Sequence, residues 1–120
     1  MLTVYHYPRC STCKKALKYL DALKKKYEKV PIVEHPPTTS ELKTMLRYLT
    51  ANGKTFKNLF NTSGEQYRAL KIGDRIKAGM TEQEAIALLS KNGNLIKRPF
   101  LLTEKGGTTG FQEETWDELI

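Results

Sequence analysis

The sequence predicts an α/β fold with a mixed four-stranded sheet, in the order β-α-β, a helical insertion, then β-β-α. Three observations predict this class. A β-branched and aromatic segment opens the chain, two capping-box sequences begin amphipathic helices in its middle, and a Gly-Gly pair separates two strand-like segments near its end. Strand patterns that alternate with helical patterns are typical of helices packed on a sheet.

The N-terminal part predicts a β-α-β unit. Residues 2–7 have the composition of a buried strand, which Pro8 ends. A helix is then expected from residue 13 to residue 27, and its apolar positions are Ala16, Leu17, Leu20, Leu23 and Tyr27. Residues 30–33 are expected to form a second strand, and Pro31 favours an edge position or an irregular start.

The remaining elements complete a single domain over residues 1–120, with its helical insertion at about residues 38–93. Capping boxes at 38–41 and 81–84 begin the two main helices of the insertion. Three glycines are expected to break the short helical pieces between them: Gly64, Gly73 and Gly79. Residues 100–103 and 108–111 are expected to form a hairpin around Gly106-Gly107, followed by a closing helix over Glu113–Leu119 with the single tryptophan, Trp116.

Length and composition narrow the function classes. The chain of 120 residues can bury a core of its own, and no apolar run approaches the ~18 residues of a membrane span. The N-terminus lacks the layout of a signal peptide, so we expect a cytoplasmic protein without membrane association. We also expect a monomer, because nothing in the sequence indicates an obligate dimer.

The chain is basic, with a formal net charge of +7. Most of the excess is expected on the outer face of one helix: Lys14, Lys15, Lys18, Lys24, Lys25 and Lys26. This face is either solvated surface, or an electropositive rim that favours a thiolate or attracts an acidic partner. Direct nucleic-acid binding is not expected, since no helix-turn-helix or aromatic-plus-basic strand pattern occurs.

The two cysteines lie in one C-x-x-C sequence, Cys10-Ser11-Thr12-Cys13. A secreted disulfide framework would need more cysteines, and a structural zinc site would need four ligands; we therefore expect no metal. The loop directly follows the first strand of a β-α-β unit, which is typical of a thioredoxin-like redox site. Cys10 is the expected nucleophile, because free backbone amides at a helix start stabilise a thiolate or an oxyanion. Cys13, one turn further on, is placed to act as the resolving thiol.

Three further residues are candidates for the same site. Arg98-Pro99 precedes the predicted hairpin, where a thioredoxin-like fold has a cis-proline opposite the thiol loop. Arg98 would then direct a cation at the thiol pocket, and the alternatives are a trans proline and a surface salt bridge. His6, four residues before Cys10, is either a protonated imidazole that favours a thiolate or a half-buried strand histidine bonded to a backbone group.

Three segments of the chain, at 5–10, 35–38 and 96–99, resemble the arsenate reductase/Spx family, and the resemblance runs from residue 2 to about residue 118. The resemblance implies a thioredoxin-like core with a helical insertion. The family's glutaredoxin-linked arsenate reductases have a nucleophile that matches Cys10 and loop residues around the oxyanion that match Ser11 and Thr12. Their histidine and their arginine before the proline match His6 and Arg98.

Two other arginines of those reductases are missing here, because Asn61 and Phe111 stand at the expected positions. Each charge-assisted hydrogen bond contributes roughly 1.5–3 kcal/mol, so we expect weak arsenate binding. The resemblance implies a thiol–disulfide oxidoreductase without a bound cofactor. It acts on arsenate or another small oxidised substrate, with glutathione and glutaredoxin, or thioredoxin, as electron donor.

The resemblance also implies an alternative function. Spx-like regulators use both cysteines as a thiol switch and bind the C-terminal domain of the RNA polymerase α subunit. A glycine that matters for that contact corresponds to Gly53, which is also a natural helix C-cap. Gly110-Phe111 is similar to Spx, whereas residues 60–64 depart from its pattern. The sequence therefore indicates a divergent branch of the family.

Overall fold

The structure is a computed structural model that describes residues 2–120. Its elements are β1 (Leu2–His6), α1 (Ser11–Ala22), β2 (Tyr27–Pro31), α2 (Thr39–Ala51), η1 (Phe56–Leu59), α3 (Glu65–Ala69), α4 (Ile72–Lys77), α5 (Glu82–Lys91), η2 (Gly93–Leu95), β3 (Phe100–Thr103), β4 (Gly106–Thr109) and α6 (Glu113–Leu119). The sheet has the strand order β2-β1-β3-β4, in which β1 and β2 are parallel and the other pairs antiparallel. The mixed four-stranded sheet is therefore confirmed.

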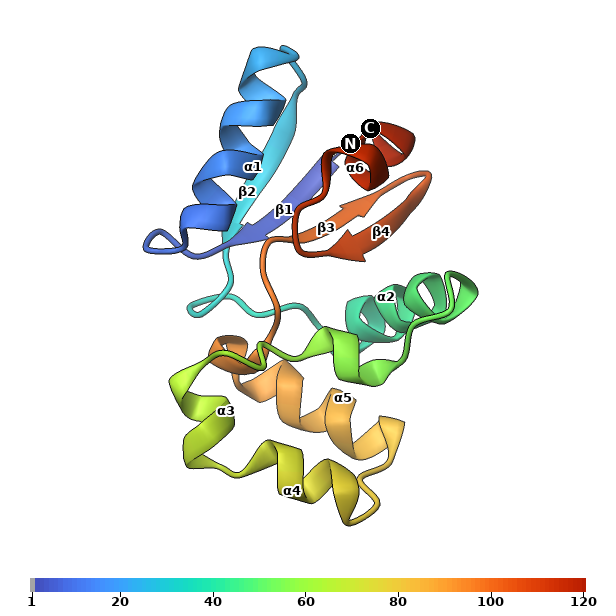
Figure 1. Cartoon of the computed structure of the whole chain (residues 1–120). Helices are drawn as coiled ribbons and strands as arrows, with labels where there is room; N and C mark the ends of the chain where they lie inside the picture. Colours follow the sequence, from blue (N-terminus) through green and yellow to red (C-terminus); the bar gives the residue numbers. More distant parts are fainter. Residues whose placement is uncertain (1) are drawn as a thin grey trace.

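The two faces of the sheet carry different helices (Figure 1). Successive side chains of a strand point to opposite faces, so Val4 and Tyr5 belong to separate cores. Val4 packs with residues of α1, β3 and α6: Ala16, Leu20, Leu101 and Trp116. Tyr5 packs with the larger core that the helices between β2 and β3 form, and its ring lies edge-on against Phe100 at 5.5 Å between centroids. The thiol loop therefore belongs to the α1 side of the sheet, whereas the helical segment covers the other side.

A short antiparallel bridge between Phe60 and Ile96 closes the helical segment just before β3. The N–H of Asn61 donates to the carbonyl oxygen of Leu95 at 2.7 Å, and the N–H of Lys97 donates to that of Leu59 at 2.8 Å. These bonds hold the chain on either side of α3, α4 and α5 together. They fix the approach of residues 97–99 to the sheet.

Helix α1 and strand β2 differ from their predicted bounds. The helix ends at Ala22, and Lys24 takes a left-handed conformation with φ 55°. Tyr27, expected as the last apolar residue of the helix, instead begins β2 and pairs with Leu2. The predicted lysine face is accordingly divided, because Lys24, Lys25 and Lys26 lie in the connection after α1.

The hairpin turn also differs from its prediction. Gly106 and Gly107 lie within β4, and the turn consists of Glu104 and Lys105. The glycines are needed for packing, because a Cβ atom at Gly107 would lie 2.8 Å from the carbonyl oxygen of Leu101. Gly73, expected to break helical structure, lies inside the short helix α4.

Other expectations hold. The capping box at Thr38 and Glu41 begins α2, and the closing helix spans Glu113–Leu119 as predicted.

Within residues 2–120, no helix has the length and apolar character required to cross a bilayer.

The close approach of η2 to the segment after β2 generates a stability prediction. A Cβ atom at Gly93 would lie 2.0 Å from the carbonyl oxygen of Ile32, so Gly93→Ala forces one backbone segment to move. We expect a loss of roughly 3 kcal/mol in the free energy of unfolding, measured by urea denaturation. The control is Gly73→Ala in α4, where the nearest atom lies 3.6 Å away. It should be neutral or stabilising by up to ~1 kcal/mol, and equal losses in both variants would contradict the packing argument.

Candidate functional site

Cys10 is the N-cap residue of α1, directly after the turn that leaves β1. Its half-buried Sγ accepts a hydrogen bond from the N–H of Cys13 at 3.3 Å. Its own N–H donates to the carbonyl oxygen of Tyr7 at 3.0 Å, which fixes the turn. The first N–H groups of a helix lack intrahelical acceptors and carry the positive end of the helix dipole. The sulfur therefore lies where a thiolate is stabilised.

Cys13 differs sharply from Cys10, because its side chain is 1% exposed. Burial raises the pKa of the Cys13 thiol to about 12, and the hydrogen bond with the side chain of Cys10 acts in the same direction. The positive charge of Arg98 acts the other way, but it does not outweigh burial. Cys13 is therefore a protonated thiol at neutral pH, in hydrogen-bond contact with Cys10, and both cysteines are free.

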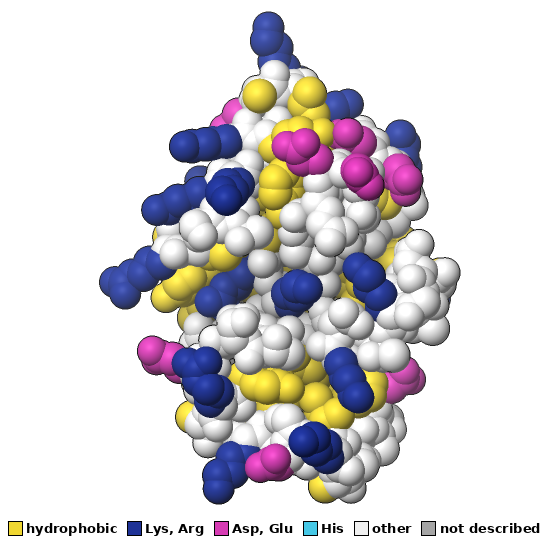
Figure 2. All heavy atoms as spheres, in the orientation of Figure 1, with side chains coloured by type: hydrophobic (Ala, Val, Ile, Leu, Met, Phe, Trp, Pro, Cys, Tyr) yellow, Lys and Arg dark blue, Asp and Glu magenta, His cyan; other side chains and the backbone are white. Residues whose placement is uncertain are grey.

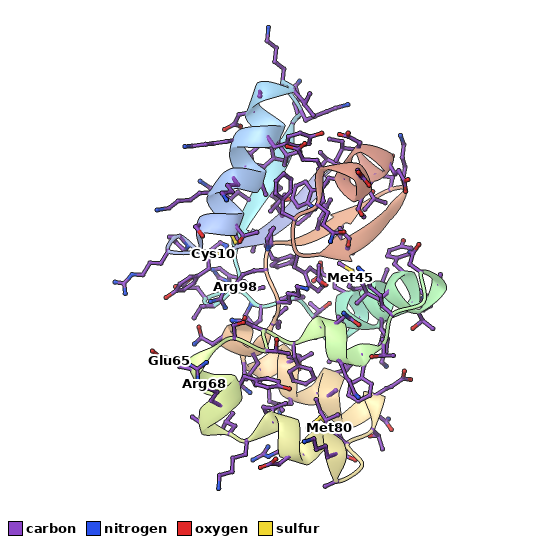
Figure 3. The ribbon with its side chains drawn as sticks, viewed as in Figure 1. Cys10, Met45, Glu65, Arg68, Met80 and Arg98 are labelled. Atoms are coloured by element: carbon purple, nitrogen blue, oxygen red, sulfur yellow. The ribbon has the colours of Figure 1, made fainter. Side chains whose placement is uncertain are left out.

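Arg98 and Pro99 lie in the segment that enters β3, the strand next to β1. The Arg98–Pro99 peptide bond is cis, the isomer that the topology favours. The guanidinium Cζ lies 4.5 Å from the ring centroid of Tyr7, and Nη1 donates to the carbonyl oxygen of Asn94 at 3.4 Å. Figure 3 shows Arg98 beside Cys10, below the start of α1. No carboxylate of residues 2–120 forms an ion pair with Arg98, so the surface salt bridge does not occur in the part of the chain that the structure describes.

The other predicted residues of the site have different surroundings. Ser11 and Thr12 begin α1 with exposed side chains. His6 is buried at the end of β1, and its burial lowers the pKa of the imidazole below the usual value, with the charge of Lys29 acting in the same direction. The imidazole is therefore neutral at pH 7. Of the two alternatives, the lowered pKa favours a buried strand histidine over a protonated His6 beside the thiolate.

The two positions that lack an arginine lie in separate places. Asn61 lines a pocket of about 400 Å³ together with Arg98 and Tyr7. Phe111 packs its ring edge-on against Tyr19 and Trp116, with centroid distances of 5.4 and 5.1 Å. The side chain of Phe111 thus packs against the core beside α1 and α6, and it does not line this pocket.

The pocket also contains residues that the sequence did not single out: Arg9, Glu65, Gln66 and Asn94. The position of Arg9 directly before Cys10 is the sequence signal that could have identified it as a residue of the site. Glu65 and Gln66 come from α3, and a short helix gives no sequence signal for where it docks.

Charge is unevenly distributed over the surface around the site. Figure 2 shows Lys and Arg side chains along the flank of the molecule over α1, and Asp and Glu side chains gathered over α6. The exposed acidic side chains of α6 are Glu113, Glu114, Asp117 and Glu118. No three His, Cys, Asp or Glu side chains among residues 2–120 are grouped as a metal site.

Comparisons with known proteins agree on one family. The model of the ArsC family matches residues 5–119. The uncharacterized protein YusI of Bacillus subtilis is 39% identical over 117 residues, which cover 98% of this chain and 96% of the relative. The global transcriptional regulator Spx of Streptococcus mutans is 30% identical over 115 residues, which cover 95% of this chain and 79% of the relative. The lower identity to Spx agrees with the predicted divergent branch.

Two solved structures have the same fold over nearly the whole chain. A putative ArsC family related protein from Bacteroides fragilis has a TM-score of 0.90 and 41% identity, with 99% of this chain and 97% of that chain covered. A possible arsenate reductase from Streptococcus mutans has a TM-score of 0.84 and 39% identity, with 98% of each chain covered. The thioredoxin-like α/β fold is therefore confirmed.

The different burial of the two thiols predicts selective alkylation. At pH 7 we expect iodoacetamide to modify Cys10 at least ~10-fold faster than Cys13, because Cys13 is buried and its thiolate is scarce. Peptide mass spectrometry of the reduced native protein gives both rates. Urea-denatured protein is the control, and there the two rates should converge. Equal modification of both thiols in the native protein would contradict the assigned burial.

The lowered pKa of His6 predicts an acid-sensitive contribution to stability. In the unfolded chain, His6 binds a proton as the pH falls to about 6.5, whereas in the folded protein it binds the proton only at lower pH. The free energy of unfolding therefore has its full value above pH 6.5 and decreases as the pH drops below it. Glutamine does not titrate, so His6→Gln should lose less free energy of unfolding between pH 7.5 and 5.5 than the unaltered protein does. The difference should be a fraction of the ~1.4 kcal/mol per pH unit that the uptake of one proton contributes. Urea denaturation at both pH values measures it. The exposed His35→Gln is the control, and an unchanged pH dependence in His6→Gln would show that His6 is not the group concerned.

Proposed function

The chain belongs to the ArsC family, and on that premise we propose that it is a thiol–disulfide oxidoreductase with Cys10 as nucleophile and Cys13 as resolving thiol. The observation that carries the proposal is the pair of free thiols within one helical turn, Cys10 half-buried at the start of α1 and Cys13 buried, with the N–H of Cys13 bonded to the Sγ of Cys10 at 3.3 Å. A pair of this kind can alternate between two thiols and a disulfide without a large movement of the backbone.

The chemistry follows from the different states of the two thiols. The Cys10 thiolate, supported by the N–H of Cys13 and the start of α1, attacks a sulfur of the oxidised substrate and displaces a thiolate. Cys13 then loses its proton and attacks the Cys10 Sγ, which releases the second half of the substrate. The high pKa of Cys13 keeps it from competing as the first nucleophile.

The surroundings of the thiols favour an oxidised sulfur compound over arsenate. Arg98 is the one cation retained at the three positions where the arsenate reductases have arginine. Asn61 supplies a neutral amide to the pocket, and the ring of Phe111 is engaged in a core. Two missing charge-assisted bonds, at roughly 1.5–3 kcal/mol each, weaken oxyanion binding by at least ~100-fold. The proposed site therefore consists of Cys10, Cys13 and Arg98, with Ser11, Thr12 and Pro99 around the attacked group.

The proposal includes a source of electrons. Glutathione with glutaredoxin, or thioredoxin, would return the Cys10–Cys13 disulfide to two thiols. Such donors are maintained in the cytoplasm, where the proposal places the protein. The electropositive flank over α1 suits an acidic donor protein.

The test is NADPH consumption coupled to reductase and donor, with arsenate or the uncharged hydroxyethyl disulfide as substrate. We expect turnover of the disulfide, and loss of at least ~100-fold in Cys10→Ser. Cys13→Ser should lose the thioredoxin-linked reaction but keep a glutathione-linked one, because glutathione can resolve the intermediate on Cys10. Arsenate should react far more slowly than the disulfide. A reaction without protein is the control, and equal rates in Cys10→Ser and the unaltered protein would refute the proposal.

A second candidate is a redox-switched adaptor that binds the C-terminal domain of the RNA polymerase α subunit. The identity of 30% to Spx over 95% of the chain favours it. Gly53 lies exposed after α2 at φ 78°, and a Cβ atom added there would meet no atom within 4 Å. This position is compatible with both a contact surface and a simple C-cap. Absence of turnover with both donors, together with a reversible disulfide, would favour this candidate. Capture of the α domain by neither redox form would exclude it.

A further inference from the structure

We infer that the pocket beside Cys10 selects small disulfides that carry an amino-acid group, with its α-ammonium and α-carboxylate, as cystine does. The inference rests on the proposed oxidoreductase and names its substrate class. The pocket has a volume of about 400 Å³, within the ~300–1,000 Å³ of small-molecule sites and ample for one amino-acid group. Its lining residues are Tyr7, Arg9, Asn61, Gly64, Glu65, Gln66, Asn94 and Arg98.

The pocket is lined by Tyr7 and Arg9, which belong to the turn that precedes Cys10. Arg9 is the residue before Cys10, and the carbonyl oxygen of Tyr7 accepts the N–H of Cys10 at 3.0 Å. Arg98 lies on the ring of Tyr7. In Figure 3, Cys10, Arg98 and Glu65 follow one another down the same side of the molecule, from the start of α1 to the start of α3. A group attached to the sulfur that Cys10 attacks can therefore enter this pocket.

The pocket contains charges of both signs that are not paired with each other. Arg9 and Arg98 bring two guanidinium groups, and Glu65 brings one carboxylate. Within residues 2–120, neither Arg9 nor Glu65 has a hydrogen bond or an ion pair from its side chain. Arg98 has one long bond to a backbone oxygen and its contact with Tyr7, so most of its donors remain available. Both signs are therefore free to engage a ligand.

This arrangement discriminates among ligand charges. A multiply charged oxyanion gains from Arg98 but is repelled by Glu65, and a simple amine gains from Glu65 but is repelled by the two arginines. A zwitterion satisfies both, with its carboxylate on the guanidinium groups and its ammonium on Glu65. An amino-acid group on a disulfide sulfur is a compact zwitterion of this kind.

Amide side chains complete the pocket. Asn61, Gln66 and Asn94 each bring donors and an acceptor, and none of the three side chains has a hydrogen bond within the described chain. The amide of Asn61 is packed against Gly64, where a Cβ atom would lie 2.8 Å from its Nδ2. Gly64 thus leaves room for an amide at the position where the family's arsenate reductases have an arginine.

The proposed reaction is balanced by the two cysteines. The Cys10 thiolate forms a bond to one sulfur of cystine, the S–S bond of cystine breaks, and one cysteine thiolate leaves and takes up the proton of Cys13. Cys13 then bonds to the Cys10 Sγ, and the second cysteine leaves as a thiolate that water protonates. The protein gives up two electrons and gains its disulfide, while cystine becomes two cysteines.

The test is a single turnover of the reduced protein with three disulfides that differ in charge: cystine, cystamine without carboxylates, and 3,3′-dithiodipropionate without ammonium groups. The readout is the rate at which the Cys10–Cys13 disulfide appears by mass spectrometry, divided by the rate of each compound with 2-mercaptoethanol in solution. We expect the corrected rate for cystine to exceed both others at least ~10-fold. Similar corrected rates for all three would overturn the inference while leaving the oxidoreductase intact. No Cys10-dependent reaction with any disulfide would overturn both.

A matched pair of variants tests the role of Glu65. Glu65→Gln should reduce the preference for cystine over 3,3′-dithiodipropionate at least ~5-fold, because the ammonium group loses its partner. Glu82→Gln, which alters a first-turn glutamate of α5 outside the pocket, should keep the preference. An unchanged preference in Glu65→Gln would overturn the assignment of Glu65.

A fourth compound distinguishes the two sources of an amino-acid group. In oxidised glutathione the α-ammonium and α-carboxylate lie several bonds further from the sulfur than in cystine, so we expect a slower corrected rate. A faster one would overturn the assignment to amino-acid disulfides in favour of the tripeptide.

Discussion

The register between β1 and β3 is the constraint on which the site depends. Tyr5 lies opposite Phe100, and the two strands run antiparallel. The chain that leaves β1 toward Cys10 therefore lies beside the chain that enters β3 through Arg98 and Pro99. A shift of one residue would turn the side chains of β1 to the wrong faces and exchange the surroundings of Val4 and Tyr5. The packing of both cores thus fixes the position of the cation relative to the thiols.

The second feature that shapes the site is the different burial of its two cysteines. The start of α1 gives Cys10 an accessible, electropositive position, whereas the next turn carries Cys13 into the protein, where ionisation is unfavourable. Two chemically identical side chains three residues apart therefore differ in exposure and in how readily they ionise, which is the basis of the proposed order of reaction. Tyr7 and Arg9, which precede Cys10, also line the pocket of mixed charge, so in the proposed reaction one small molecule would carry both the attacked sulfur and the recognised group.

Much of the fold follows from local patterns in the sequence. The capping box at Thr38 specifies the start of α2 through contacts within four residues, and the β-branched and aromatic composition of residues 2–7 predicts the buried strand β1. The end of α1 was not predictable in this way, because Leu23 continues the helical pattern and nevertheless lies exposed at the C-cap. The glycines of β4 were assigned to a turn, since their close approach to Leu101 is a tertiary contact. For the site, adjacency in sequence identified Cys10 and Cys13, whereas the α3 wall of the pocket depends on how distant helices pack.

The bridge between Phe60 and Ile96 has a consequence for how the protein can diversify. It joins the two ends of residues 61–95, the segment that contains α3, α4 and α5, and α5 also packs against α2 (Figure 1). This segment also contacts Arg98 directly, because the carbonyl oxygen of Asn94 accepts a hydrogen bond from its guanidinium group. Within the segment, Glu65 and Gln66 are exposed side chains that line the pocket, so they can be replaced without a change in the core that supports the thiol pair. In the proposed reaction, the residues that recognise the substrate would therefore vary independently of the two cysteines that react with it.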